Sequence, residues 1–122
     1  MATTVTTDEK RAELCSDVLV IALDGGIGYW AVVQNVIRSG EFSVSSMQVR
    51  DSEDTDAAWF IVNRPEIERA LRRTASDSTI RIRRDIRAAA AVALAENDAS
   101  EVDCEVADVV VQVAVFGDII FG

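Results

Sequence analysis

The chain has 122 residues, of which 49% are hydrophobic and 27% charged, a composition that excludes a disordered protein and fits one globular domain over residues 1–122. It has no histidine and two cysteines. These counts exclude a Ser-His or Cys-His catalytic pair, a histidine-ligated zinc and a four-cysteine zinc site within one chain. The formal net charge of −9 argues against direct binding to DNA.

Two sequence features bear on where the protein acts. No apolar run approaches the roughly 18 residues that a membrane span needs. The N-terminal sequence MATTVTTDEK lacks the basic and apolar regions of a signal peptide. We therefore expect a cytoplasmic protein without a membrane partner. In a reducing compartment, Cys15 and Cys104 are expected to be small buried side chains and not a disulfide.

The first predicted element is a helix over residues 8–23. Thr7 is a suitable N-cap, because its hydroxyl can accept a hydrogen bond from a free N–H of the first turn. Apolar residues recur at helical spacing and form one stripe, made of Leu14, Val18, Ile21 and Ala22. Gly25 and Gly26 are predicted to end the helix, since glycine readily adopts the left-handed backbone conformation found after a helix.

Three strands are predicted next. Residues 28–37 are rich in aromatic and β-branched side chains, and residues 41–50 follow after a turn, so the two segments are expected to form an antiparallel hairpin. In the second strand the apolar alternation changes face at Met47, which indicates a β-bulge. Residues 57–62 are predicted to add a third strand.

The remaining chain is predicted to be helical. Asn63 is expected to cap a helix that ends near Thr74, and residues 79–95 are expected to form a longer one. Residues 103–116 are rich in valine, so a strand is an alternative there, but Gly117 is a helix-end signal and favours a helix. The predicted fold class is α+β, with an N-terminal helix, an antiparallel β-hairpin or three-stranded meander, and then about three helices.

Charge is distributed unevenly along the chain. Residues 64–87 contain eight arginines and four acids, whereas residues 96–118 contain seven acids and no base. The arginines could form an anion-binding face, or they could be neutralised by the acidic C-terminal segment. We favour neutralisation, because the protein is acidic overall.

Five aromatic or arginine side chains are candidates for contact with a ligand or partner. Tyr29 and Trp30 are adjacent on the predicted strand, so one ring is expected in the core and the other at the surface. A surface ring can stack on a base or anchor an interface. Trp59 has the same two interpretations. Arg72 and Arg73 could hold a phosphate, a possibility that Arg81, Arg83 and Arg84 share, although a solvated helix face is the simpler interpretation.

Gln112 is the sixth candidate, because it interrupts an otherwise apolar segment. Its amide needs hydrogen-bond partners, which could lie on a second helix, on another subunit or on a ligand. The tail, residues 118–122, is apolar and is expected to dock on the core or on another subunit. Both features, together with the small alanines of the helix predicted over residues 79–95, favour self-association, most simply as a two-fold dimer.

Two stretches of the chain resemble known sequences. ALDGGIGYWA at residues 22–31 and DCEVADVVVQVAVFGDIIFG at residues 103–122 are similar to segments of a group of small proteins encoded by phages of actinobacteria. The resemblance implies a small accessory protein that acts inside an infected cell. It assigns no catalytic residue, cofactor or metal.

Three non-enzymatic functions are therefore considered, since no nucleophile-base pair, metal cluster or cofactor loop is apparent. The leading hypothesis is an accessory protein that binds a host protein through an acidic surface and the apolar tail. The alternatives are a sponge for a nucleotide signal of host defence and an acidic mimic of nucleic acid. A pocket that brings together an aromatic ring and at least two arginines would favour the sponge.

Overall fold

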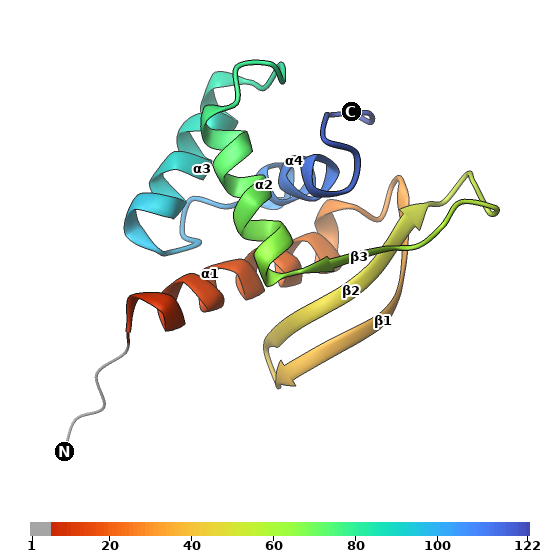
Figure 1. The fold of residues 1–122 in the computed structure, drawn as a ribbon, viewed down its shortest axis with the longest axis horizontal. Coiled ribbons are helices and arrows are strands. Elements are labelled where there is room, and N and C mark those ends of the chain that lie inside the picture. Colours follow the sequence, from red (N-terminus) through yellow and green to blue (C-terminus); the bar gives the residue numbers. More distant parts are fainter. Residues whose placement is uncertain (1–5) are drawn as a thin grey trace.

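The computed structural model describes residues 6–122, so the predicted absence of a signal peptide falls largely outside the described residues. In chain order, the elements are α1 (Thr7–Ile21), the π-helical turn η1 (Ala22–Gly26), β1 (Ala31–Gly40), β2 (Ser43–Asp51), β3 (Phe60–Asn63), α2 (Arg64–Ser76), α3 (Arg84–Glu96) and α4 (Cys104–Phe116). The order confirms the predicted α+β class, with the meander of three strands (Figure 1).

The three strands form one antiparallel sheet in the order β1-β2-β3. α1 packs against β2, while α2 and α4 contact β3. The face turned toward the helices buries Val44, Met47, Val49 and Val62 completely or nearly so. In Figure 1 the tip of the β1–β2 hairpin extends away from the helices.

The β-bulge predicted in the second strand is present. Ile37 pairs with Ser46, but Arg38 pairs with Val44, so Ser45 has no opposing residue. The extra residue shifts the alternation along β2, and this shift allows both Val44 and Met47 to face the core.

Both ends of the first helix differ from the prediction. Thr6, not Thr7, is the N-cap, and its hydroxyl accepts a hydrogen bond from the N–H of Glu9. Gly25 and Gly26 do not adopt a left-handed conformation; they lie in η1, which continues the helix. Gly26 instead lies close to the backbone of α4, since a Cβ there would lie 3.1 Å from the carbonyl oxygen of Cys104.

Three other boundaries shift. β1 begins at Ala31, because residues 28–30 form a turn in which Trp30 and Ala31 donate N–H bonds to the carbonyl of Ile27. β3 is shorter than predicted and begins at Phe60. The predicted helix over residues 79–95 begins only at Arg84. The apolar spacing that suggested its first turn belongs to a loop that buries Ile80.

The valine-rich last segment is a helix, as predicted, and the strand alternative is wrong. Asp103 caps α4 by accepting a hydrogen bond from the N–H of Val106 at 2.9 Å. Gly117 ends the helix in the left-handed conformation, with φ of 71°. Nine of its thirteen residues are buried, including Asp108 and Gln112, so α4 is the helix around which the others pack.

Among residues 6–122, no helix has both the length and the apolar character required to cross a membrane.

Candidate functional site

A buried carboxylate on α4 is the centre of a polar network. Asp108 accepts hydrogen bonds from the Tyr29 hydroxyl at 2.6 Å, the Trp30 indole N–H at 2.7 Å and the Gln112 amide at 3.0 Å. One ring of the adjacent aromatic pair is in the core and the other is at the surface, since Trp30 is 2% exposed and Tyr29 is 60% exposed. They are presented by the turn before β1 and not by the strand itself.

Gln112 holds the C-terminal tail on the protein's own core. Its Oε1 accepts hydrogen bonds from the backbone N–H groups of Ile120 and Phe121, both at 2.8 Å. Its Nε2 donates to the carbonyl of Phe121 at 3.1 Å. Both ends of the fully buried amide are thus satisfied within one chain. The tail was expected to dock either on the core or on another subunit, and in the structure it docks on the core.

An aromatic cluster covers this network. The rings of Trp30 and Phe121 stack with their centroids 5.2 Å apart and their planes 9° from parallel. Phe116, the last residue of α4, packs at an angle against both of them. Because the tail brings Phe121 to Trp30, the stacking and the Gln112 hydrogen bonds act together to fix the tail.

Beside the network lies a hollow of about 620 Å³, called the α4 hollow below. Apolar walls are provided by Ile86, Val109, Ile119 and Phe121, and polar groups by Tyr29, Arg81, Arg83, Cys104, Glu105 and Asp108. Its size falls in the range of about 300–1,000 Å³ that is typical of small-molecule sites. The hollow therefore combines an apolar wall, an aromatic ring and charged groups at one place.

The loop before α3 delivers two arginines to the α4 hollow. Arg87 fixes this loop by donating hydrogen bonds to the carbonyls of Thr74 at 3.1 Å and Asp77 at 2.6 Å. Arg83 is paired with Glu105 and with Asp85, both at 2.7 Å. In the described part of the chain, Arg81 makes no ion pair. Arg81 is therefore the unneutralised cation of the hollow.

The hydroxyl of Tyr29 is held in its protonated form. Partial burial and the hydrogen bond to Asp108 raise the pKa of Tyr29 to about 12. The hydroxyl therefore remains a hydrogen-bond donor across the physiological pH range and does not act as a base there.

The other three predicted residues lie away from the α4 hollow. Trp59 is covered by the guanidinium of Arg50, which stands 4.4 Å from the ring centroid. Arg72 is paired with Glu68 at 3.4 Å, one turn away on α2. Arg73 is paired with Asp77 at 3.0 Å and also donates to the carbonyl of Gly117. Trp59, Arg72 and Arg73 thus do not form a common site with Tyr29, Trp30 and Gln112.

The ion pairs of the arginine-rich segment are mainly with its own acids, and among the described residues only four of its eight arginines form any. Within residues 6–122, Arg83–Glu105 is the only ion pair that joins the segment to the acidic C-terminal segment. The predicted neutralisation by the acidic C-terminal segment is therefore wrong except at Arg83. Arg69, Arg72 and Arg73 each pair with an acid three or four residues away, because this spacing places side chains side by side on a helix.

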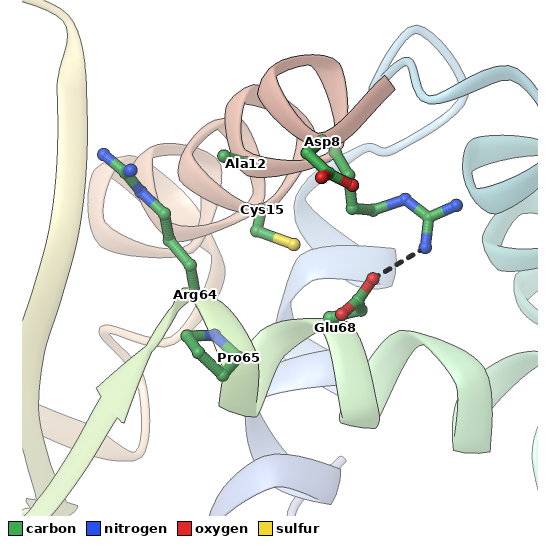
Figure 2. Close-up of a pocket in the computed structure, with 7 residues that line it drawn as sticks. Asp8, Ala12, Cys15, Arg64, Pro65 and Glu68 are labelled. Atoms are coloured by element: carbon green, nitrogen blue, oxygen red, sulfur yellow. Dashed lines mark hydrogen bonds and ion pairs between the residues drawn. The ribbon is translucent and has the colours of Figure 1, made fainter. Parts of the chain in front are cut away.

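A smaller hollow of about 200 Å³ lies between α1 and α2, and Figure 2 shows the residues that line it. Arg11 and Glu68 form an ion pair at 2.8 Å beside Cys15. Burial raises the pKa of the Cys15 thiol to about 11, so the thiol is protonated and a poor nucleophile. Cys104 is exposed, contrary to the prediction that both cysteines are buried.

The main residues that the sequence did not reveal are Asp108 and Phe121. Asp108 was one of seven acids in its segment, and only its position next to Gln112 on the same helix face could have marked it. Arg81 and Arg83 were among five arginines considered as phosphate ligands, and nothing in the sequence distinguished them from Arg72, Arg73 and Arg84. In the described residues, no cluster of three or more Cys, Asp or Glu side chains could hold a metal ion.

The comparisons with known proteins leave the site to be interpreted from its geometry. No model of a protein family matches the chain, and no curated protein or solved structure matches it significantly.

Proposed function

We propose that the protein is a non-enzymatic binding protein that takes a small ligand of mononucleotide size into the α4 hollow. Such a ligand combines a planar heteroaromatic ring with one anionic group. The single observation that supports the proposal is the meeting of Tyr29 and Phe121 with Arg81 and Arg83 around one hollow. An aromatic ring beside two arginines is the arrangement that would favour a nucleotide sponge over the other hypotheses.

Each part of the ligand would meet a matching group. The ring would stack against Tyr29, whose side chain is 60% exposed and whose hydroxyl is fixed by Asp108, so little side-chain entropy remains to be lost. The anionic group would bind Arg81, since a guanidinium offers several hydrogen-bond donors to phosphate or carboxylate oxygens.

The charge of the hollow limits the ligand to a single anionic group. Two arginine and two carboxylate side chains line it, beside Gly122, and Arg83 is already engaged by Asp85 and Glu105. A nucleoside triphosphate would bring several negative charges close to Glu105 and Asp108. A nucleoside monophosphate or a cyclic mononucleotide would meet the unpaired Arg81 and avoid most of that repulsion.

Isothermal titration calorimetry with AMP, GMP, cyclic AMP and cyclic GMP tests the proposal. At least one of them should bind, and Arg81→Ala should weaken that binding about tenfold or more, because a hydrogen bond to a charged group contributes about 1.5–3 kcal/mol. Arg72→Ala removes an exposed arginine away from the hollow and should leave the affinity unchanged. Absence of binding by all four, or equal effects of the two variants, would contradict the proposal.

A second candidate function is supported by a different observation. Four acids and one base, Lys10, line one depression between α1 and the end of α3; the acids are Glu13, Asp17, Glu96 and Asp98. Burial raises the pKa of Asp17, and the nearby carboxylates of Glu13 and Asp98 raise it further. Carboxylates that repel one another in the free protein would be relieved by a basic partner.

The second candidate function is that of an accessory protein that binds a host protein. The binding surface would be the acidic depression, because the apolar tail is docked on the protein's own core. Asp98→Lys should reduce salt-sensitive binding to a basic host protein, whereas Glu53→Lys, an exposed change in the β2–β3 loop, should have a smaller effect. Equal loss with both variants would point to net charge alone.

A further inference from the structure

The sheet has one face that the helices leave open. Cross-strand pairing places Val32 opposite Arg50, Gln34 opposite Gln48 and Gln48 opposite Ile61, and all of these side chains point away from the buried face. The apolar members are well exposed, with Val32 at 38% and Ile61 at 60%. Ile37, at 58% exposed, extends this surface toward the hairpin tip and belongs to the open sheet face, as it is called below.

The open sheet face is nearly free of charge. None of its positions is acidic, although the chain has 21 acidic residues and a net charge of −9. Its one charged residue, Arg50, lies over the ring of Trp59 and donates to the carbonyl of Thr55 at 3.0 Å. A surface depleted of charge and containing aliphatic, aromatic and arginine side chains has the composition of an interface core.

The centre of the face is a group of three side-chain amides that is complementary to the same group on a second molecule. Gln34 and Asn35 both donate to the Oε1 of Gln48, at 2.8 and 2.9 Å. Amides both donate and accept hydrogen bonds, so the same group on a second molecule offers complementary partners. A two-fold interface requires such self-complementarity, since each surface meets its own copy.

We propose that the open sheet face binds a second copy of this chain in a two-fold dimer. Two molecules of charge −9 repel each other at most approaches, and this face itself presents no carboxylate, although the acidic loop over residues 51–56 adjoins it at Arg50. A basic partner would find no carboxylate here to pair with. Gln112 and the tail, which the sequence suggested as dimer contacts, are instead satisfied within one chain.

The size of the face sets the strength of the dimer. The area of the face is about 300 Å² per molecule, calculated from three strands about 4.8 Å apart and roughly six residues per strand at about 3.3 Å each. This is below the ~800 Å² per partner of standard interfaces. The dimer should therefore dissociate on dilution.

Sedimentation velocity of the full chain over a range up to about 0.5 mM tests the proposal. The wild type should show a reversible monomer–dimer equilibrium, and about 1 M salt should not weaken it. At that salt concentration the screening length for charge interactions is about 3 Å. Ile61→Lys should raise the dimer dissociation constant about tenfold, because it places two cations in an apolar contact. Ile120→Lys is the matched control, since Ile120 is 58% exposed on the tail, and it should change that constant less than about twofold.

Three results would overturn the proposal: a monomer throughout this range, equal weakening by both variants, or a dimer that salt dissociates. Val92→Lys distinguishes the main competing contact, because Val92 is 37% exposed on the alanine-rich helix α3. If Val92→Lys abolishes the dimer and Ile61→Lys does not, the contact is through α3 and the open sheet face is not the interface. Circular dichroism of each variant verifies that these exposed substitutions leave the fold intact.

Discussion

Replacing Asp108 by alanine would remove the acceptor at the centre of the α4 network. Three donors would lose their partner at once: the Tyr29 hydroxyl, the Trp30 indole and one N–H of Gln112. These donors differ in whether another hydrogen-bond acceptor is available to them. Tyr29 is exposed and can turn to water, and Gln112 keeps its bond to the tail carbonyl of Phe121. The Trp30 N–H is buried and has Asp108 as its one hydrogen-bond acceptor in the described residues.

The magnitude follows from these differences. An unsatisfied buried donor costs about 1–3 kcal/mol, and a lost hydrogen bond to a charged group about 1.5–3 kcal/mol. Allowing for solvation of Tyr29 and for the charge that no longer needs to be buried, we expect Asp108→Ala to lower the free energy of unfolding by about 3–4 kcal/mol. That is a large fraction of the roughly 5–15 kcal/mol that stabilises an ordinary domain.

Urea unfolding, followed by circular dichroism and tryptophan fluorescence, measures this loss. Asp108→Asn should be much milder, about 1 kcal/mol, because its Oδ1 can still accept from both Trp30 and Gln112. Glu101→Ala, an exposed change in the loop before α4, should be nearly neutral. If Asp108→Ala were as stable as Glu101→Ala, the carboxylate would not organise the network and the reasoning would be wrong.

Three further predictions concern single groups. The only tyrosine, Tyr29, should titrate near pH 12 by ultraviolet absorbance in the folded protein and near its ordinary pKa of 10 in urea. Because the fold raises this pKa, the stability that the Tyr29 hydroxyl contributes is complete below pH 10 and disappears as the pH rises through about 12. Iodoacetamide should label exposed Cys104 and spare Cys15 in the native protein, as mass spectrometry would show; labelling of both would contradict the burial of Cys15. Gly26→Ala should lower stability by about 1–3 kcal/mol, whereas Gly28→Ala, with no atom within 4 Å of its added Cβ, should have little effect in thermal unfolding.

The sequence predicted most elements of the fold because their local signals agree with their packing. Asn63 caps α2 by accepting from the N–H of Glu66, and Gly117 ends α4, as their residue types indicate. The errors occur where tertiary contact overrides a local preference. Gly26 was expected to stop a helix, but the backbone of α4 passes so close that a Cβ at this position would lie 3.1 Å from the carbonyl oxygen of Cys104. No pattern within residues 8–23 contains that information.

The site was predicted only in part, for a related reason. Tyr29, Trp30 and Gln112 stand out in the sequence because an aromatic pair and an isolated amide are unusual in their surroundings. Asp108 does not stand out, because the chain has 21 acids, and Arg81 is one of five arginines to which the sequence assigns the same possible role. Their role depends on which of many similar side chains the loops bring to α4, and this is set by long-range packing.

The two stretches on which the sequence resemblance rests form one structural unit. Tyr29 and Trp30 come from the first stretch, and Asp108, Gln112 and Phe121 come from the second. The two stretches depend on each other: Gly26 in the first permits α4 to approach, and Gln112 in the second fixes the tail against Trp30. Since both also line the α4 hollow, a change in either stretch should alter stability and ligand binding together, whereas Arg81, on a separate loop, should alter binding alone.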